Sequence, residues 1–226
     1  MKMKLLTFYS DSHTEIYENF FLKSYNLYLS ESFELYAKYI PQISPTGEYN
    51  SKGFSHTMLE KIHHIINNID ITDVQPMVFS DCDVQFFSDF SQDIIKEIGN
   101  NDIAFQDDVT VLCAGFFICK QNIATLSFFE QIYRILKNEM DRGIDDQVII
   151  NNVLRSNPNI INFGVLPSDK YYTVASTIKS VWNGQDFTLP STIFVHHANW
   201  TVGIKNKLQL LNIVREKVLY LRDGKE

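Results

Sequence analysis

Cysteines are few in this sequence, and they form no recognisable framework. Cys82, Cys113 and Cys119 are odd in number, and their spacings match neither a zinc site nor a set of disulfides. A chain without such a framework is simplest to place in a reducing compartment. We therefore expect a cytoplasmic protein whose cysteines are free.

Long apolar runs are missing as well. A membrane-spanning helix needs about 20 consecutive apolar residues, and no stretch of this chain approaches that length. The apolar run near the N-terminus is only about five residues long and stops at Asp11, which is too short for the core of an export signal. We expect a first strand there, in a soluble protein without a membrane span.

Positive charge is also scarce. Lys and Arg number 20 against 27 Asp and Glu, which gives a formal net charge of -7 at pH 7, and the lysines are scattered along the chain. Proteins that bind the phosphate backbone of nucleic acids usually carry a basic stripe. The charge balance therefore argues against a nucleic-acid partner.

The composition is that of a globular protein. The 226 residues are 45% hydrophobic and 13% aromatic, well above the hydrophobic content of disordered chains. This length suffices for one sizeable core and does not require two. Repeats, low-complexity tracts and convincing linkers are missing, so we expect residues 1–226 to form a single domain.

Short apolar segments alternate with amphipathic ones along the chain. The pattern predicts strands at 4–9, 33–40, 77–79, 102–105, 111–119, 160–166 and 192–196. It predicts helices at 13–25, 54–69, 89–97 and 122–138, a further helix that starts at 145–146, and a last one at 205–221. Such alternation is typical of an α/β domain. The strand pair within 102–119 has a short connection, so we expect a mixed, mostly parallel sheet flanked by helices.

One segment between the predicted elements has the composition of a loop. Residues 43–52 are rich in Ser, Pro, Gly and Asn and predict a loop that could cover a site.

Asp81 and Asp83 directly follow the apolar strand at 77–79. Ligands of open α/β sheets bind beyond the carboxyl ends of strands, and hard cations prefer carboxylate oxygens. The pair indicates a metal site, with a turn-forming pair of carboxylates as the simpler alternative.

Three further features follow in order along the chain: Ala114-Gly115 in a later strand, Asp146-Gln147 at a helix start, and His196-His197 after the last strand. A strand glycine suggests close approach of another group to the backbone, or plain packing. An Asp at a helix start is also an ordinary cap. Either histidine could face the site, because a shift of one residue turns a strand side chain to the other face.

In this order and spacing, the four features resemble the GT-A glycosyltransferases, and most closely the retaining nucleotide-diphospho-sugar transferases. The resemblance extends from Lys4 to about Lys207. It implies a GT-A, Rossmann-like fold and a metal-dependent, hexosyltransferase-type enzyme. Such an enzyme moves a sugar from a nucleotide-diphosphate donor, here a UDP-sugar, to a hydroxyl acceptor, which would be a glycan, a protein or a small molecule.

The resemblance also implies a ligand set for the metal, which would be Mn²⁺ or Mg²⁺. Asp83 and His197 would bind it, and Asp81 would be shared between the metal and the ribose of the donor. His196 is the competing choice for the imidazole ligand. Mn²⁺ accepts an imidazole beside oxygen ligands, which suits this set of residue types.

Roles at the transferred sugar follow from the same resemblance. Asp146 would hold the sugar, Gln147 would lie near the reactive carbon, and Gly115 would let the sugar approach the backbone. Because an amide is a weak nucleophile, front-face attack by the acceptor fits better than a double displacement, and we expect retention of configuration. Asp107 and Asp108 could contact the sugar or the acceptor, or cap a turn.

The nucleotide would lie at the end of the first strand. Thr7, Tyr9 and Asp11 close that strand, where enzymes of this kind hold the base and the ribose. Tyr9 offers a ring for stacking, and Asp11 offers acceptor oxygens.

Two lysines match basic residues that face the diphosphate in the family. Lys61 stands on the helix before the Asp81 strand, and Lys207, with Lys205 as second choice, follows the histidines. For each lysine the alternative is an exposed helix charge. The segment HHANWTVGIKNK departs from the tighter His-x-x-Gly-x-x-Lys form, which weakens the assignment of the late lysine.

Two other functions fit the same fold. A sugar-nucleotide nucleotidyltransferase or donor hydrolase is one, but nucleotidyl transfer favours a glycine-rich basic first loop, which Ser10-Asp11-Ser12 lacks. A catalytically idle module that binds glycans or protein is the other, and metal-independent sugar binding would favour it. Several aromatic residues could form an acceptor platform or belong to the core: Trp182, Trp200, Phe187, Tyr171 and Tyr172.

Overall fold

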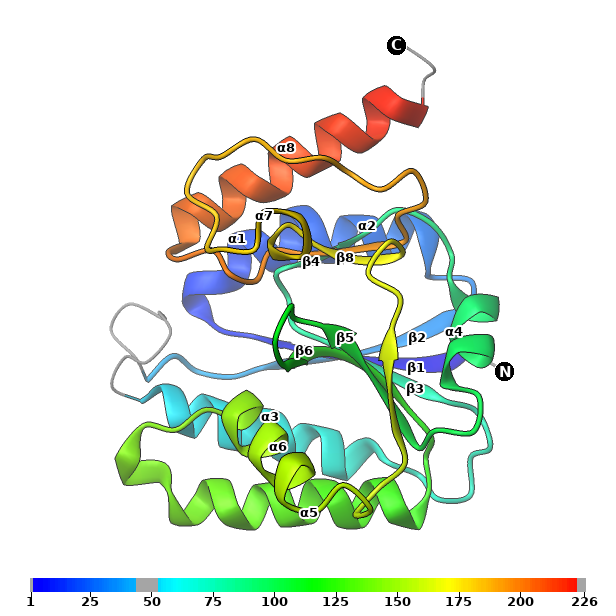
Figure 1. Ribbon diagram of the computed structural model, residues 1–226, viewed down its shortest axis with the longest axis vertical. Helices are drawn as coiled ribbons and strands as arrows, with labels where there is room; N and C mark the ends of the chain where they lie inside the picture. The colour runs from blue at the N-terminus through cyan, green and yellow to red at the C-terminus, as the bar shows by residue number, and fades with distance from the viewer. Residues whose placement is uncertain (1, 44–52, 223–226) are drawn as a thin grey trace.

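The structure is a computed structural model that describes residues 2–43 and 53–222. Within these residues a six-stranded sheet lies at the centre, with helices on both faces (Figure 1). Its strands are β1 (Met3–Tyr9), β2 (Phe33–Tyr39), β3 (Met77–Ser80), β5 (Ile103–Asp107), β6 (Leu112–Cys119) and β7 (Phe163–Leu166). Their order is β2-β1-β3-β6-β5-β7, and only the pairs made by β6 are antiparallel. The predicted mixed, mostly parallel sheet is confirmed.

Helices cover the sheet in two layers. One face carries α3 (Phe54–Asn68), α5 (Ile123–Asn138) and α6 (Asp146–Ser156), drawn below the sheet in Figure 1. On the other side lie the N-terminal helical segment and, farthest from the large sheet, α8 (Ile204–Arg222). The short helices α4 (Ser91–Ile98) and α7 (Ala175–Ile178) and the single turn η3 (Met140–Arg142) complete the helices of the described residues.

The N-terminal helical segment is less regular than its sequence predicts. It consists of η1 (Asp11–His13), α1 (Thr14–Ile16), the π-helical η2 (Tyr17–Leu22) and α2 (Lys23–Tyr28). The Ser24 hydroxyl donates to the carbonyls of both Phe20 and Phe21. This extra local bonding accompanies the wider turn, which periodicity alone does not reveal.

The hydrophobic core lies on both faces of the large sheet, because other elements cover both faces. Successive strand residues point to opposite faces. Leu5 and Phe116 pack toward the N-terminal helices, whereas Leu6 and Phe117 pack toward α3 and α5, and all four are fully buried. Continuous apolar strands such as 77–79 are therefore expected here, as in any sheet covered on both sides.

A second, three-stranded sheet was not predicted. It consists of β4 (Val84–Phe86), β9 (Val195–His197) and β8 (Tyr171–Thr173), in the order β4-β9-β8, and packs between the large sheet and α8 (Figure 1). Each strand has only three residues, too few to show a period of two. Phe187, Trp182 and both tyrosines of β8 are buried in the cores around it, so the hypothesis of an acceptor platform was wrong for these four residues.

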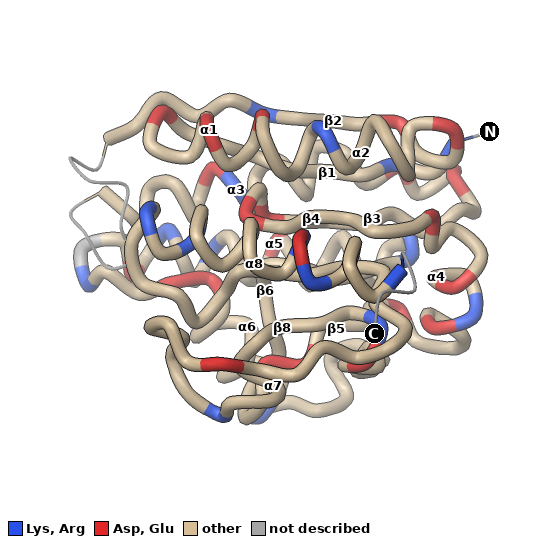
Figure 2. Tube along the Cα trace, turned by 90° about the horizontal axis from the view of Figure 1, so that it is seen from above, with Lys and Arg blue, Asp and Glu red and all other residues tan. Residues whose placement is uncertain are grey.

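Figure 2 shows charged residues of both signs interspersed over the described part of the chain, where they form no stripe of one sign. In the described part of the chain, no helix combines the length and the apolar character needed to cross a membrane. Residues 44–52 of the predicted loop lie outside the described residues.

Candidate functional site

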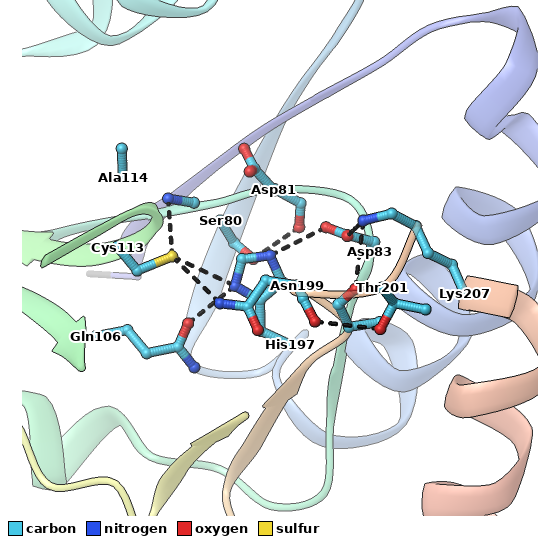
Figure 3. Close-up of polar contacts among 12 residues, drawn as sticks. Ser80, Asp81, Asp83, Gln106, Cys113, Ala114, His197, Asn199, Thr201 and Lys207 are labelled. Atoms are coloured by element: carbon cyan, nitrogen blue, oxygen red, sulfur yellow. Dashed lines mark hydrogen bonds and ion pairs between the residues drawn. The ribbon is translucent and has the colours of Figure 1, made fainter. Parts of the chain in front are cut away.

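Two carboxylates meet an imidazole beyond the end of β3. Asp81 and Asp83 follow this strand, and β4 then pairs with β9 so that Val84 lies opposite His197. The imidazole Nε2 of His197 consequently lies 3.2 Å from Oδ1 of Asp83. One ligand atom from each of Asp81, Asp83 and His197 lies within 4.8 Å of the other two (Figure 3).

The two histidines of β9 point in opposite directions. His197 faces the carboxylates, whereas His196 lies on the other face of the small sheet, where its Nδ1 is 3.2 Å from Nε2 of Gln85. Both side chains are buried. The structure therefore brings His197, and not His196, to the acidic pair.

The residue types and their free atoms fit a divalent cation. Carboxylate oxygens with one imidazole nitrogen form a ligand set that Mn²⁺ accepts, and Mg²⁺ accepts its oxygen part. Among the described residues, the buried Oδ1 of Asp81 accepts no hydrogen bond, and its charged neighbour is Lys61 at 3.2 Å. A carboxylate oxygen that accepts no hydrogen bond keeps a lone pair with which it can bind a metal ion.

Asp83 is surrounded by positive charge. Its Oδ2 forms an ion pair with Nζ of Lys207, which also donates to the carbonyl of Ala198 at 3.3 Å. Burial works to raise the pKa of Asp83, but Lys207 and His197 outweigh it and hold that pKa well below its usual value. Burial likewise works to lower the pKa of His197, and the facing Asp83 carboxylate raises it to about 10. Asp83 thus lies between two positively charged side chains.

Lys61 is an internal cation of the site. Its side chain is 2% exposed, and Nζ lies 2.8 Å from Asp146 Oδ2 and 3.2 Å from Asp81 Oδ1. The pKa of Lys61 is raised, because Asp146 and Asp81 outweigh the opposing effect of burial. The alternative of an exposed helix charge was wrong, and the lysine links the acidic strand end to the start of α6.

Gly115 occupies a position where no other residue fits without rearrangement. A Cβ added there would lie 2.5 Å from Asp81 Oδ2 and 2.5 Å from His197 Cε1. The Gly115 carbonyl also accepts a hydrogen bond of 2.6 Å from the backbone N–H of Asp81. Glycine on β6 is therefore what lets two candidate ligands approach the sheet.

A polar network continues from α6 to the loops around the site. Gln147 Oε1 accepts from the backbone N–H of Ala114 at 3.1 Å, and its Nε2 donates to Asp108 Oδ2 at 3.0 Å. Asn199 donates to the other oxygen of Asp108 at 2.7 Å. Burial raises the pKa of Asp108 despite these hydrogen bonds. Val109, the next residue, has φ of 71°, an uncommon conformation for a β-branched residue.

The residues expected to hold the nucleotide lie at the end of β1. Tyr9 stacks on Tyr17 with ring centroids 4.1 Å apart. Asp11 accepts a hydrogen bond of 2.7 Å from the hydroxyl of Tyr39. Thr7 is fully buried in the strand. Tyr9 and Asp11 are thus partly accessible, while Thr7 lies behind them.

Sequence reasoning missed two members of the site. Gln106 and Asn199 contact His197 and Asp108, but each contact joins positions more than 80 residues apart in the chain. The available signal was the position of Gln106, which is the second-last residue of a buried strand that ends at Asp107.

Comparison with known proteins gives a family and a fold. The model of a family described as nucleotide-diphospho-sugar transferase matches residues 31–211. A comparison with curated proteins returns no match.

Three solved structures illustrate the likeness in fold. The apo form of the glycosyltransferase GlyE of Streptococcus pneumoniae TIGR4 superposes with a TM-score of 0.58 at 14% identity, over 96% of this chain and 64% of that one. A glycosyltransferase involved in glycosylation of the major capsid of PBCV-1 gives 0.62 at 10% identity, over 94% and 100%. Galactosyltransferase LgtC, in complex with donor and acceptor sugar analogues, gives 0.57 at 9% identity, over 87% of each chain. The chain thus spans less than two thirds of GlyE.

Proposed function

Because the chain belongs to the nucleotide-diphospho-sugar transferase family of enzymes, we propose that it moves a sugar from a nucleotide-diphosphate donor to a hydroxyl acceptor. The expected GT-A fold, with its mixed central sheet between helices, is confirmed. We propose a UDP-sugar as donor, a glycan, protein or small molecule as acceptor, and a single catalytic domain over residues 1–226. The observation that carries this proposal is the group of Asp81, Asp83 and His197 at a strand end.

In this proposal the group holds Mn²⁺ or Mg²⁺. When bound, a divalent cation neutralises the diphosphate leaving group and orients it. Asp83 and His197 bind the cation, and Asp81 is shared between it and the ribose. Lys207 forms an ion pair with Asp83. A cation on Asp83 would compete with this ion pair, and the ammonium group of Lys207 would then be available to a diphosphate oxygen.

Asp146 and Gln147 are proposed to act at the transferred sugar. Gln147 is held at both ends of its amide, by Ala114 and by Asp108. A fixed, neutral amide is a poor nucleophile, which supports front-face attack and retention. In that step the acceptor oxygen bonds to the anomeric carbon, the bond from that carbon to the phosphate oxygen breaks, and the phosphate takes the hydroxyl proton. An inverted product in an NMR assay of the anomeric centre contradicts this part.

The nucleotide would bind beside β1. Tyr9 and Asp11 are proposed to contact the base and the ribose, with the buried Thr7 behind them. Gly115 lets Asp81 and His197 pack against the backbone, so its role toward the sugar is to keep these groups in place.

Thermal stability tests the proposal directly. UDP, GDP, CDP and ADP are compared, each with and without Mn²⁺. A ligand at about 100 times its dissociation constant adds about 2.7 kcal/mol, a shift of roughly 5 to 10 °C for a domain of this size. We expect a manganese-dependent shift with UDP that Asp83→Ala abolishes. The exposed Asp186 supplies the control, since Asp186→Ala leaves the shift intact.

Two other outcomes of this experiment would change the proposal. A shift with a different diphosphate corrects the donor class. No shift with any nucleotide contradicts the transferase proposal and favours the idle binding module on the same fold.

A further inference from the structure

Each histidine of β9 is hydrogen-bonded to a glutamine from another strand. His197 contacts Gln106 at the end of β5, and His196 contacts Gln85 in the middle of β4. Both glutamines are buried, with 0% and 2% of their surface exposed. A buried amide has few alternative partners, so its orientation is set by the groups that surround it.

The orientation of Gln106 follows from two backbone carbonyls. Its Nε2 donates to the carbonyl of Tyr171 at 3.2 Å and to that of Tyr172 at 3.4 Å. A carbonyl oxygen can only accept, so the NH₂ end of the amide must lie on that side. The oxygen Oε1 is then the atom that lies 2.8 Å from Nδ1 of His197.

This orientation decides which nitrogen of His197 carries a hydrogen. Because Oε1 of Gln106 can only accept, Nδ1 of His197 must be the donor. The other polar atom near Nδ1 is Cys113 Sγ at 3.7 Å, and sulfur is a weak partner. Nε2 is therefore the nitrogen presented to Asp81 and Asp83 (Figure 3).

Gln85 assigns the opposite arrangement to His196. Its Nε2 donates to the carbonyl of Leu211 at 2.9 Å and also lies 3.2 Å from Nδ1 of His196. Nδ1 of His196 thus accepts a hydrogen bond, and its Nε2 has no hydrogen-bond partner among the described residues. Two glutamines thus orient the two adjacent histidines in opposite ways, and only His197 directs its Nε2 at the carboxylates.

We propose that Gln106 is a positioning residue for the candidate metal ligand His197, which it holds with Nδ1 protonated and Nε2 aimed at a divalent cation. The inference rests on the metal site of the proposed function. Groups that fix a ligating imidazole in this way typically contribute about 10- to 100-fold to metal affinity. Without the Gln106 oxygen, the ring can rotate or exchange its hydrogen between the two nitrogens.

The test measures Mn²⁺ affinity by calorimetry in matched variants. Gln106→Met removes the acceptor, and we expect the dissociation constant to rise about 10- to 100-fold. Gln85→Met removes the glutamine beside His196 and is the control, with a change of no more than about twofold.

A second readout needs no metal. In protein with ¹⁵N-labelled histidine, the Nδ1–H signal of His197, assigned with His197→Gln, should be protected from exchange. Gln106→Met should abolish that protection, and Gln85→Met should leave it unchanged. Should Gln106→Met fail to fold, Gln106→Asn replaces it, because its amide is one methylene too short to reach both partners.

The outcomes distinguish a failure of the metal-site proposal from a failure of the role proposed for Gln106. An unchanged protein that binds no Mn²⁺ overturns the metal site and this inference with it. Normal Mn²⁺ binding that Gln106→Met leaves intact overturns the inference alone, as does equal weakening by Gln85→Met.

Discussion

Among single residues, Gly115 has the tightest surroundings in the site. Gly115→Ala would place a methyl group 2.5 Å from both Asp81 and His197, a separation that real Cβ atoms do not adopt. The two side chains must move apart, so we expect Mn²⁺ affinity to fall at least about 10-fold, as for a displaced ligand. Calorimetric titration with Mn²⁺ measures the effect.

Gly164 offers a matched control on β7. The nearest neighbour of a Cβ there would be the Asn101 side chain, also at 2.5 Å. Gly164→Ala should therefore lower the melting temperature without changing Mn²⁺ affinity. Unchanged affinity in Gly115→Ala would show that Asp81 and His197 do not depend on the glycine.

Lys61 is the buried counter-ion of Asp81 and Asp146, and its loss should lower the stability of the metal-free protein. Lys61→Met leaves Asp81 and Asp146 without their buried counter-ion, and breaking such a pair costs about 3–5 kcal/mol. Added Mn²⁺ should restore part of this loss, because a cation again neutralises Asp81. Urea unfolding with and without Mn²⁺ measures both effects.

The surface pair of Lys38 and Glu60 is the reference for this experiment. Both side chains are about one-third exposed, and Lys38→Met should cost at most about 1 kcal/mol. A loss in Lys61→Met no greater than in Lys38→Met contradicts the counter-ion role.

Sequence patterns identified some of these residues and not others, for physical reasons. Asp81, Asp83 and His197 stand at strand ends, where a local motif suffices to suggest a site. Lys61 lies on the helix face of Met58 and Ile65, both in the buried half of α3, so its burial could have been predicted from helical spacing. The partners of Gln106 come from distant segments, and no local pattern encodes such a contact.

At the scale of elements, one histidine joins α3 to the edge strand β2. His64 Nε2 donates to the carbonyl of Tyr36 at 3.0 Å, and its Nδ1 lies 3.2 Å from Nδ2 of Asn68. Burial lowers the pKa of His64, and the hydrogen bond to Tyr36 only partly opposes this. The folded protein thus binds a proton at His64 less readily than the unfolded chain.

This difference predicts the direction of a pH effect. The contribution of neutral His64 is complete above its unfolded pKa of about 6.5 and is lost as pH falls from there toward the lower folded pKa. His64→Gln keeps a donor for Tyr36 but does not titrate. We expect its unfolding free energy to fall less than that of the unchanged protein between about pH 7.5 and about pH 5.5.

Chemical denaturation at the two pH values provides the measurement. An equal loss of stability in His64→Gln contradicts the predicted direction.

Elements differ in how well sequence predicts them. Long helices such as α3 and α5 repeat their apolar residues over several turns, and the predicted ranges agree closely with the observed ones. The strands β4, β8 and β9 are three residues long and are defined by their pairing with one another. Such elements arise from tertiary contacts, which a single sequence does not display.

On the scale of the whole molecule, neighbouring residues on shared strands join the hydrophobic cores. Tyr171 belongs to the cluster between the large sheet and the N-terminal helices, and the adjacent Tyr172 belongs to the cluster under α8. Leu5 and Leu6 divide in the same way between the two faces of the large sheet. No cluster can lose its packing without disturbing strands of another, which supports one folding unit.

We therefore predict a single cooperative unfolding transition. Differential scanning calorimetry should give a van't Hoff enthalpy equal to the calorimetric enthalpy, within about 10%. Val214→Ala, in the core under α8, should lower the midpoint without splitting the peak. Two resolved transitions in either protein contradict the assignment of one domain to residues 1–226.

During synthesis, the candidate ligands emerge from the ribosome in the order of their places in the chain. Asp81 and Asp83 are synthesised before His197, which belongs to β9, the last strand of the described residues. A nascent chain that has already formed β1 and β3 still lacks its imidazole ligand, and β4 still lacks the strand that pairs with it. The full candidate ligand set can therefore form only after β9 has been synthesised, and a nascent chain that stops before β9 lacks the site.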